Sequence, residues 1–232
     1  MKYLYTNGCS WTAGDEINHY DKIVTNNMRY YNTWPWFLKE KLDIPVLVNE
    51  ATGGGSNKRI FRKTVNFIDR YIKSGKNPKD LMIVIGWSTE ERTEKAVKNF
   101  NNDIQHVRLL IHTALDSAAL DNHVTDLINQ YHKIYYDLYD SDVAIEETIF
   151  YLKALRSLTD GWGITYYDFP ALVFWKNNYH PVLNHLNNFH VKSFIETVNE
   201  KQWSTYQYGH PTIDTHKKWA DIMFSFIKDE RV

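Results

Sequence analysis

The sequence predicts an α/β fold built on a three-layer, doubly wound parallel sheet. Short apolar runs alternate with amphipathic helical runs along the chain, which is the pattern of repeated strand–helix–strand units. The run Leu81–Ile85 is apolar at every position, as is typical of a parallel strand covered on both faces. A length of 232 residues suits one such domain with a sizeable core.

Four segments are predicted to be the strands of this sheet. Each is a short run rich in apolar or β-branched residues, and three are followed by polar or glycine-containing turns. The four predicted strands are Lys2–Thr6, Ile44–Val48, Leu81–Ile85 and Ile164–Phe169.

The predicted helices fall between and after these strands. Trp34–Lys41 has helical apolar spacing and a proline in its first turn, and Asn57–Ser74 has Ser56 or Asn57 as its cap. A short helix is expected around Val191–Asn199, and a closing helix runs from Ile213 or Asp214 to Ile227. From about 102 to 158 the spacing is also helical, starting with Val107, Leu110 and Ile111. We expect a single domain over residues 1–232 with a helical insertion at about 102–158.

Composition limits the classes of partner. The formal net charge is −1, so neither nucleic acid nor an anionic membrane is expected as the main partner. Cys9 is the single cysteine, which precludes an internal disulfide and favours a reducing compartment. We find neither a signal-peptide pattern nor a run of roughly 18 apolar residues. The predicted location is therefore the cytoplasm.

The first candidate site follows the first predicted strand. There the chain reads Gly8-Cys9-Ser10-Trp11-Thr12. A glycine turn between a strand and a helix can present a serine hydroxyl beside outward-pointing backbone N–H groups. Ser10 is thus a candidate nucleophile with its own N–H as an oxyanion donor. The alternative is a serine that only caps a helix.

Two further segments follow strands and are glycine-rich. Gly53-Gly54-Gly55 lets the backbone approach a ligand closely, although no Gly-Lys-Ser/Thr follows it to make a phosphate-binding P-loop. Gly86-Trp87-Ser88 directly follows Leu81–Ile85, and Ser88 is a candidate hydrogen-bond donor. Because the carboxyl ends of parallel strands meet at one edge of a sheet, these segments are expected near Ser10.

The fourth segment lies just before the closing helix and reads Gly209-His210-Pro211. A residue before proline is restricted to extended geometry, which suits a rigidly held general base. The alternative is a histidine with a structural role only.

These four segments together resemble the SGNH (GDSL esterase/lipase-like) hydrolase family. Gly8–Thr12 is similar to the family's Gly-Asp-Ser-x-Thr block, and the stretch 49–55 resembles the second block with Gly54 at the oxyanion glycine. Gly86–Ser88 stands where the family has Gly-x-Asn-Asp, and His210-Pro211 resembles the last block, with His216 six residues on. The resemblance implies a flavodoxin-like SGNH fold with Ser10 and His210 as catalytic residues. The Gly-Trp-Ser and Gly-His-Pro forms resemble a divergent branch found in bacteriophage genomes.

The chain departs from the family pattern at three positions. Cys9 replaces an aspartate, and Ser88 replaces the third-block asparagine that donates to the oxyanion. Gln207 stands where the family has its acid, three residues before the histidine. Glutamine can hold an imidazole but cannot stabilise imidazolium as a carboxylate does. Either a Ser–His dyad operates, or Asp214 or Asp168 supplies the acid, or the site is inactive.

The predicted function is ester hydrolysis. Ser10 attacks a carbonyl and His210 moves the proton. The oxyanion donors are the N–H groups of Ser10 and Gly54, with Ser88 or Asn57 as additional candidates. The alternatives are an inactive binding or assembly protein that kept the fold, and an acyltransferase that uses the same nucleophile.

The expected substrate is a small ester, and the many tyrosines and tryptophans are compatible with an O-acylated carbohydrate. No cofactor is expected. His180, His185 and His190 recur every five residues, which does not place them on one helical face, so no metal site is predicted.

Overall fold

A parallel sheet of four strands forms the centre of the molecule. The computed structural model describes residues 1–17, 29–98, 104–110, 113–115, 122–172, 188–190 and 192–229. The strand order is β2-β1-β3-β7, with every neighbouring pair parallel. The strands are β1 (Tyr3–Asn7), β2 (Val46–Asn49), β3 (Leu81–Trp87) and β7 (Thr165–Pro170). This arrangement confirms the predicted fold class.

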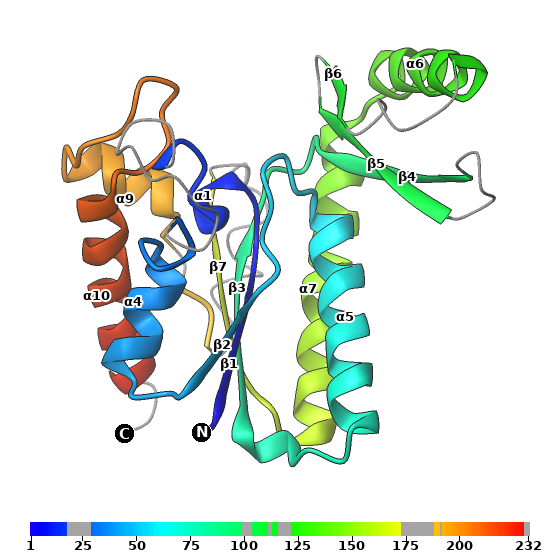
Figure 1. The fold of residues 1–232 in the computed structure, drawn as a ribbon. Helices are drawn as coiled ribbons and strands as arrows, with labels where there is room; N and C mark the ends of the chain where they lie inside the picture. The colour runs from blue at the N-terminus through cyan, green and yellow to red at the C-terminus, as the bar shows by residue number, and fades with distance from the viewer. Residues whose placement is uncertain are drawn as a thin grey trace.

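Helices cover both faces of the sheet, which gives the three layers visible in Figure 1. One layer contains α4 (Trp34–Lys41), α9 (Phe194–Glu200) and α10 (Ile213–Asp229). The other contains α5 (Asn57–Lys73) and α7 (Ser141–Trp162), which pack against each other. All seven residues of β3 are buried between these layers, as the uniformly apolar sequence of this strand predicted.

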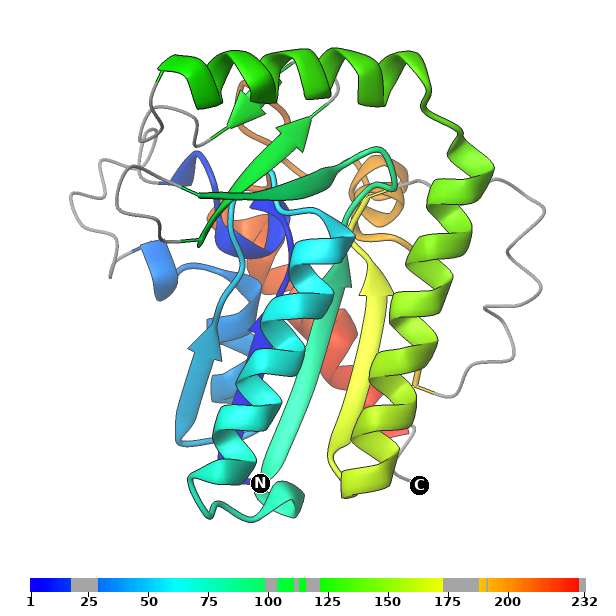
Figure 2. The same cartoon turned by 90° about the vertical axis from the view of Figure 1, so that its right-hand side faces the viewer.

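A small second sheet stands beyond the carboxyl ends of the central strands. It is antiparallel, with the order β4-β5-β6, and consists of β4 (Thr93–Lys98), β5 (Ile104–Leu110) and β6 (Thr113–Leu115). Helix α6 (Asn122–Asp137) lies across it, as Figure 2 shows. Val107, Leu109 and Ile128 form a separate small core between the sheet and this helix.

The helical prediction for the segment that begins near residue 102 is therefore wrong for β5 and β6. Val107 and Leu110 fit a helical repeat, but the buried residues of β5 are Val107 and Leu109, which is the two-residue period of a strand. Pairing with β4 along six residue pairs fixed that choice. The later helices α6 and α7 do occur, and α7 packs against β7 as part of a main layer.

A buried carboxylate ties the two strands β3 and β7 to helix α7. Asp168 on β7 is fully buried. It accepts hydrogen bonds from Trp87 Nε1 at 3.0 Å and Tyr166 OH at 2.8 Å, and it pairs with Arg156 of α7. Burial raises the pKa of Asp168, and these three donors oppose that effect.

The mutation Asp168→Ala is expected to destabilise the fold strongly. It leaves the largely buried Arg156 guanidinium without its carboxylate, a change that costs on the order of 3–5 kcal/mol in the free energy of unfolding. Urea denaturation followed by circular dichroism measures this loss. Asp69→Ala serves as the control because Asp69 pairs with Lys73 on the exposed surface of α5, and equal losses in both variants would contradict the assignment.

Candidate active site

The segment between β1 and helix α1 (Ser10–Ala13) presents the candidate nucleophile. Cys9 caps the helix with extended backbone, and its carbonyl accepts from the N–H groups of Thr12 and Ala13 at 3.0 Å. Ser10 begins the helix with 6% of its surface exposed. The chain therefore turns sharply from strand to helix at Ser10, as the sequence predicted.

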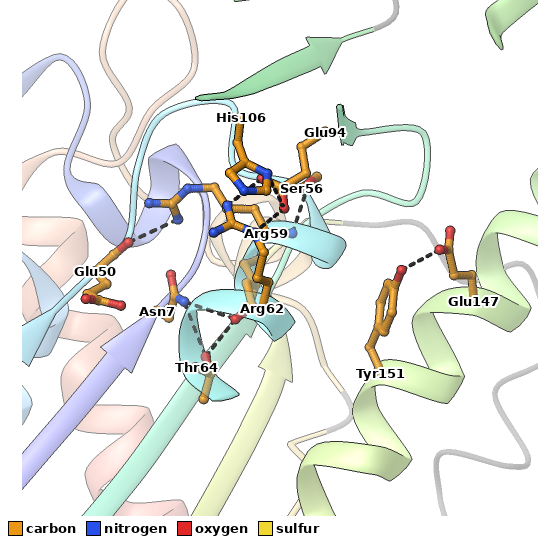
Figure 3. A network of polar contacts seen from close by, with 11 residues as sticks. Asn7, Glu50, Ser56, Arg59, Arg62, Thr64, Glu94, His106, Glu147 and Tyr151 are labelled. Atoms are coloured by element: carbon orange, nitrogen blue, oxygen red, sulfur yellow. Dashed lines mark hydrogen bonds and ion pairs between the residues drawn. The ribbon is translucent and has the colours of Figure 1, made fainter. Parts of the chain in front are cut away.

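Asn7 fixes this turn to helix α5. Its amide nitrogen lies 3.2 Å from the Ile60 carbonyl oxygen and 3.3 Å from Thr64 Oγ1 (Figure 3). Its side-chain oxygen accepts from the N–H of Gly8 at 2.9 Å. Because Asn7 is fully buried, these bonds hold the turn in one position.

The glycine turn after β2 packs directly on the Ser10 turn. The N–H of Thr52 donates to the Gly8 carbonyl at 3.2 Å. A Cβ atom on Gly55 would lie 3.0 Å from that same carbonyl oxygen, so a side chain has little room there. Gly54 has φ +66°, a left-handed conformation that glycine adopts without strain. Within the described part of the chain, the N–H groups of Ser10 and Gly54 donate to no protein acceptor, as expected for oxyanion donors.

His210 is held by a carboxylate that the sequence analysis did not identify. Nδ1 of His210 lies 2.6 Å from Oε2 of Glu16. The same carboxylate accepts from the backbone N–H groups of Tyr208 and His210, each at 3.1 Å. Glu16 has φ +73°, a strained conformation for a residue other than glycine. A carboxylate on Nδ1 leaves Nε2 as the nitrogen available for proton transfer, which is the arrangement of a catalytic triad.

The electrostatics of the two neighbouring carboxyls differ. Burial opposes ionisation of Glu16, but the bonds from the His210 side chain and from the N–H groups of Tyr208 and His210 outweigh it, and they lower its pKa. Burial raises the pKa of Asp15, against the opposing charges of His210, Arg29 and Arg108. Of the two carboxyl groups, Glu16 is therefore the one whose surroundings favour the anion beside His210.

The structure places none of the three predicted acids or orienters on Nδ1 of His210. Asp168 is in the core with Arg156. Asp214 is exposed in the first turn of α10 and pairs with Lys218 at 2.6 Å. Gln207 stands three residues before His210, but Glu16 occupies the Nδ1 position that the family's acid would take. The carboxylate that contacts Nδ1 comes instead from the loop that follows α1.

Ser88 and Asn57, both predicted as additional oxyanion donors, form hydrogen bonds with each other. The N–H of Ser88 donates to Asn57 Oδ1 at 2.7 Å, and Asn57 Nδ2 donates to the Ser88 carbonyl at 3.0 Å and to Thr148 Oγ1 at 3.1 Å. Ser88 Oγ accepts from Arg92 at 3.2 Å. Both amide hydrogens of Asn57 are therefore already used, whereas the Ser88 hydroxyl hydrogen has no acceptor among the described contacts.

Ser10 and His210 are connected through the residues that follow Ser10 in the chain. The Ser10 carbonyl accepts from the N–H of Gly14 at 3.0 Å and from that of Asp15 at 3.2 Å. The next residue, Glu16, holds His210. Among the described contacts, no hydrogen bond joins Ser10 Oγ to the His210 ring. Catalytic hydrogen bonds are often long before substrate binds.

The other histidines have separate surroundings. His216 is fully buried, and its Nδ1 accepts from the Trp34 N–H at 3.2 Å. Burial lowers the pKa of His216 to about 3, so it is a neutral core residue. The rings of His190 and Trp219 pack edge to face, while His180 and His185 lie outside the described residues.

In the described ranges, no three histidine, cysteine or acidic side chains gather as metal ligands. Among the described helices, none has both the length and the apolar character that a membrane crossing requires.

Comparisons with known proteins assign a family. The model of the family of unknown function DUF6071 matches residues 17–175. The chain belongs to this family. The match begins after Ser10 and Glu16 and ends before His210. No curated protein sequence matches the chain.

Two solved structures are similar to the fold of this family member. The psychrotrophic esterase EstA from Pseudoalteromonas sp., in a form inhibited by monoethylphosphonate, has 10% identity and a TM-score of 0.48, with 99% of this chain and 96% of that chain covered. TesA has 12% identity and a TM-score of 0.48, with 98% and 97% covered.

The stability contributed by Glu16 is expected to depend on pH. A carboxyl whose pKa is lowered by folding stabilises the protein above its ordinary pKa, about 4.3 for glutamate, and this contribution is lost as the pH falls through the lower folded value. Wild type should therefore exceed Glu16→Gln in free energy of unfolding at pH 7, and the difference should shrink below about pH 4. Urea denaturation across this range measures it. A difference that stays constant into acid would contradict the assignment.

Proposed function

We propose that this protein is a serine ester hydrolase with Ser10 as nucleophile, His210 as general base and Glu16 as the acid of the triad. The Glu16–His210 contact at 2.6 Å carries the proposal. It supports a full triad where the sequence alone left a dyad, a remote acid or an inactive site open. The resemblance of the Ser10, Gly54 and His210 segments to SGNH hydrolases supports the same interpretation.

The proposed reaction has two halves. Ser10 Oγ attacks the ester carbonyl carbon while its proton passes to Nε2 of His210, and the N–H groups of Ser10 and Gly54 bind the oxyanion. His210 then protonates the departing alcohol as the C–O bond breaks, which leaves an acyl-serine. A water molecule attacks this ester and gives its proton to His210. The carboxylic acid leaves as Ser10 recovers the proton. Glu16 stabilises the imidazolium in both halves.

A second function, binding without catalysis, is favoured by one observation. The described structure has no hydrogen bond between Ser10 Oγ and His210, and an inactive protein that kept the fold would not need one. The two functions differ in whether Ser10 reacts, so labelling of Ser10 separates them.

Ser10→Ala is expected to abolish ester hydrolysis and labelling by a fluorophosphonate probe. The reason is that the variant removes the oxygen that attacks the carbonyl or the phosphorus. Hydrolysis of a panel of aryl esters and mass spectrometry of the labelled protein measure the two effects. A wild-type protein that cleaves no ester and takes up no probe would contradict the hydrolase function.

Glu16→Gln is expected to lower kcat by roughly 10²- to 10⁴-fold, because glutamine cannot stabilise the imidazolium. Steady-state kinetics measure this effect. Asp214→Asn is the matched control, because it removes the alternative acid on α10 and should leave kcat unchanged. Reversed results for the two variants would transfer the acid role to Asp214.

We propose an O-acylated carbohydrate as the substrate class, and release of acetate from acetylated sugars would test it. We also propose a cytoplasmic location and a relationship to bacteriophage-encoded members.

A further inference from the structure

A basic pocket lies between helix α5 and the small sheet, apart from the triad. It has a volume of about 320 Å³ and is lined by side chains of the loop after β2, of α5, and of β4 and β5. The lining residues are Thr52, Arg59, Arg62, Lys63, Glu94, His106 and Arg108. Four of these side chains are arginine or lysine, and Glu94 is the one carboxylate in this described lining.

The single carboxylate is already neutralised. Glu94 has 3% of its surface exposed and receives two bonds from Arg62, at 2.6 Å from Nε and 2.8 Å from Nη2 (Figure 3). Such a two-point pair fixes the geometry of both side chains. The pair therefore joins the small sheet to α5 and leaves the charges of Arg59 and Lys63 in excess within the pocket lining.

Neutral groups help to hold two of the remaining cations in place. Arg59 Nη1 donates to the Glu50 carbonyl at 3.1 Å (Figure 3). Arg108 donates to Thr52 Oγ1 at 3.3 Å and to the Gly53 carbonyl. Burial lowers the pKa of Arg59, in opposition to the attraction of Glu94. Burying a cation without a full counter-charge is unfavourable, and an anionic ligand would relieve that cost.

The pocket borders the candidate active site through the glycine turn. Arg108 binds the carbonyl of Gly53, which directly precedes the oxyanion glycine. A Cβ atom on Gly53 would clash with Asp15 Oδ2, so this turn packs against the residue that precedes Glu16. The charges of both Arg108 and His210 act on Asp15. A ligand in the pocket would therefore lie next to the turn that carries Gly54.

We propose that this pocket binds an oxyanion, a phosphate or a carboxylate, and that this oxyanion is part of the ester substrate. Guanidinium groups match the planar, multidentate geometry of both anions. The substrate assignment rests on the hydrolase function proposed above, whereas anion binding by the pocket does not. Helix α5 and the small sheet then both contribute to substrate selection, because α5 supplies Arg59 and Lys63 and the small sheet supplies His106 and Arg108.

Binding is tested first in the Ser10→Ala background, where no ester is turned over. Inorganic phosphate and succinate are titrated by calorimetry at constant ionic strength, with glycerol as the neutral probe. We expect saturable binding of an anion and none of glycerol, and preference between the two anions assigns the phosphate or the carboxylate. Failure of both anions to bind overturns the proposal.

A matched pair of variants locates the bound anion. Lys63→Glu reverses a half-buried charge in the pocket lining, and Lys58→Glu reverses an exposed charge on the same helix outside that lining. We expect Lys63→Glu to weaken anion binding by about tenfold and Lys58→Glu to change it much less. Circular dichroism verifies that both variants fold. Equal weakening in both overturns the pocket as the site.

Kinetics then test the substrate assignment. Mono-4-nitrophenyl succinate carries a carboxylate that 4-nitrophenyl butyrate lacks. We expect the ratio of kcat/KM for the charged ester over the neutral one to fall about tenfold in Lys63→Glu and to be retained in Lys58→Glu. An unchanged ratio in Lys63→Glu overturns the assignment to substrate. A protein that binds phosphate but cleaves neither ester overturns the hydrolase function and leaves the anion site standing.

Discussion

The contact of Glu16 with His210 is the interaction on which the candidate site depends. It joins residues 194 positions apart and brings the loop before α10 onto the turn after α1. One carboxylate fixes both the backbone of residues 208 and 210 and the ring of His210. Without it, the described structure offers no other acid on Nδ1. The left-handed backbone of Glu16 is understandable as the local cost of this contact.

The sheet edge explains why such a remote contact forms. In a parallel sheet the carboxyl ends of the strands lie at the same edge, so the loops after β1, β2 and β3 are close together there. The Asn7 amide and the Thr52–Gly8 bond then lock two of these loops together. The fully buried Asp168 likewise holds β3, β7 and α7 together in the core through its bonds with Trp87 and Arg156. Buried polar groups with satisfied bonds thus set the shape of the site, and the apolar core supplies the stability.

The sequence predicted the central strands and the main helices because the strands are short uninterrupted apolar runs and the helices repeat apolar residues at helical spacing. It also predicted that the turns carrying Ser10 and Gly54 lie close together, since strand ends converge in a parallel sheet. It did not identify Glu16 as the partner of His210, because the residues considered were Gln207 and Asp214, close to His210 in the sequence, and Asp168 on the fourth predicted strand. One signal was available, namely Asp15-Glu16 one turn after Ser10. The small sheet was missed because Val107 and Leu110 fit a helical period when the pairing with β4 is unknown.

The small sheet has a consequence for how the site would choose its substrate. The pairing of β4 with β5 places Glu94 and Arg108 directly opposite one another. A helical insertion would not have paired these two residues. One of these residues binds α5 through Arg62 and the other binds the glycine turn through Gly53. The same pair of strands therefore connects the basic pocket to the segment that carries Gly54, the proposed oxyanion donor. An anion bound there would stabilise the turn in its catalytic position, so that recognition of charge and alignment of the ester would be coupled.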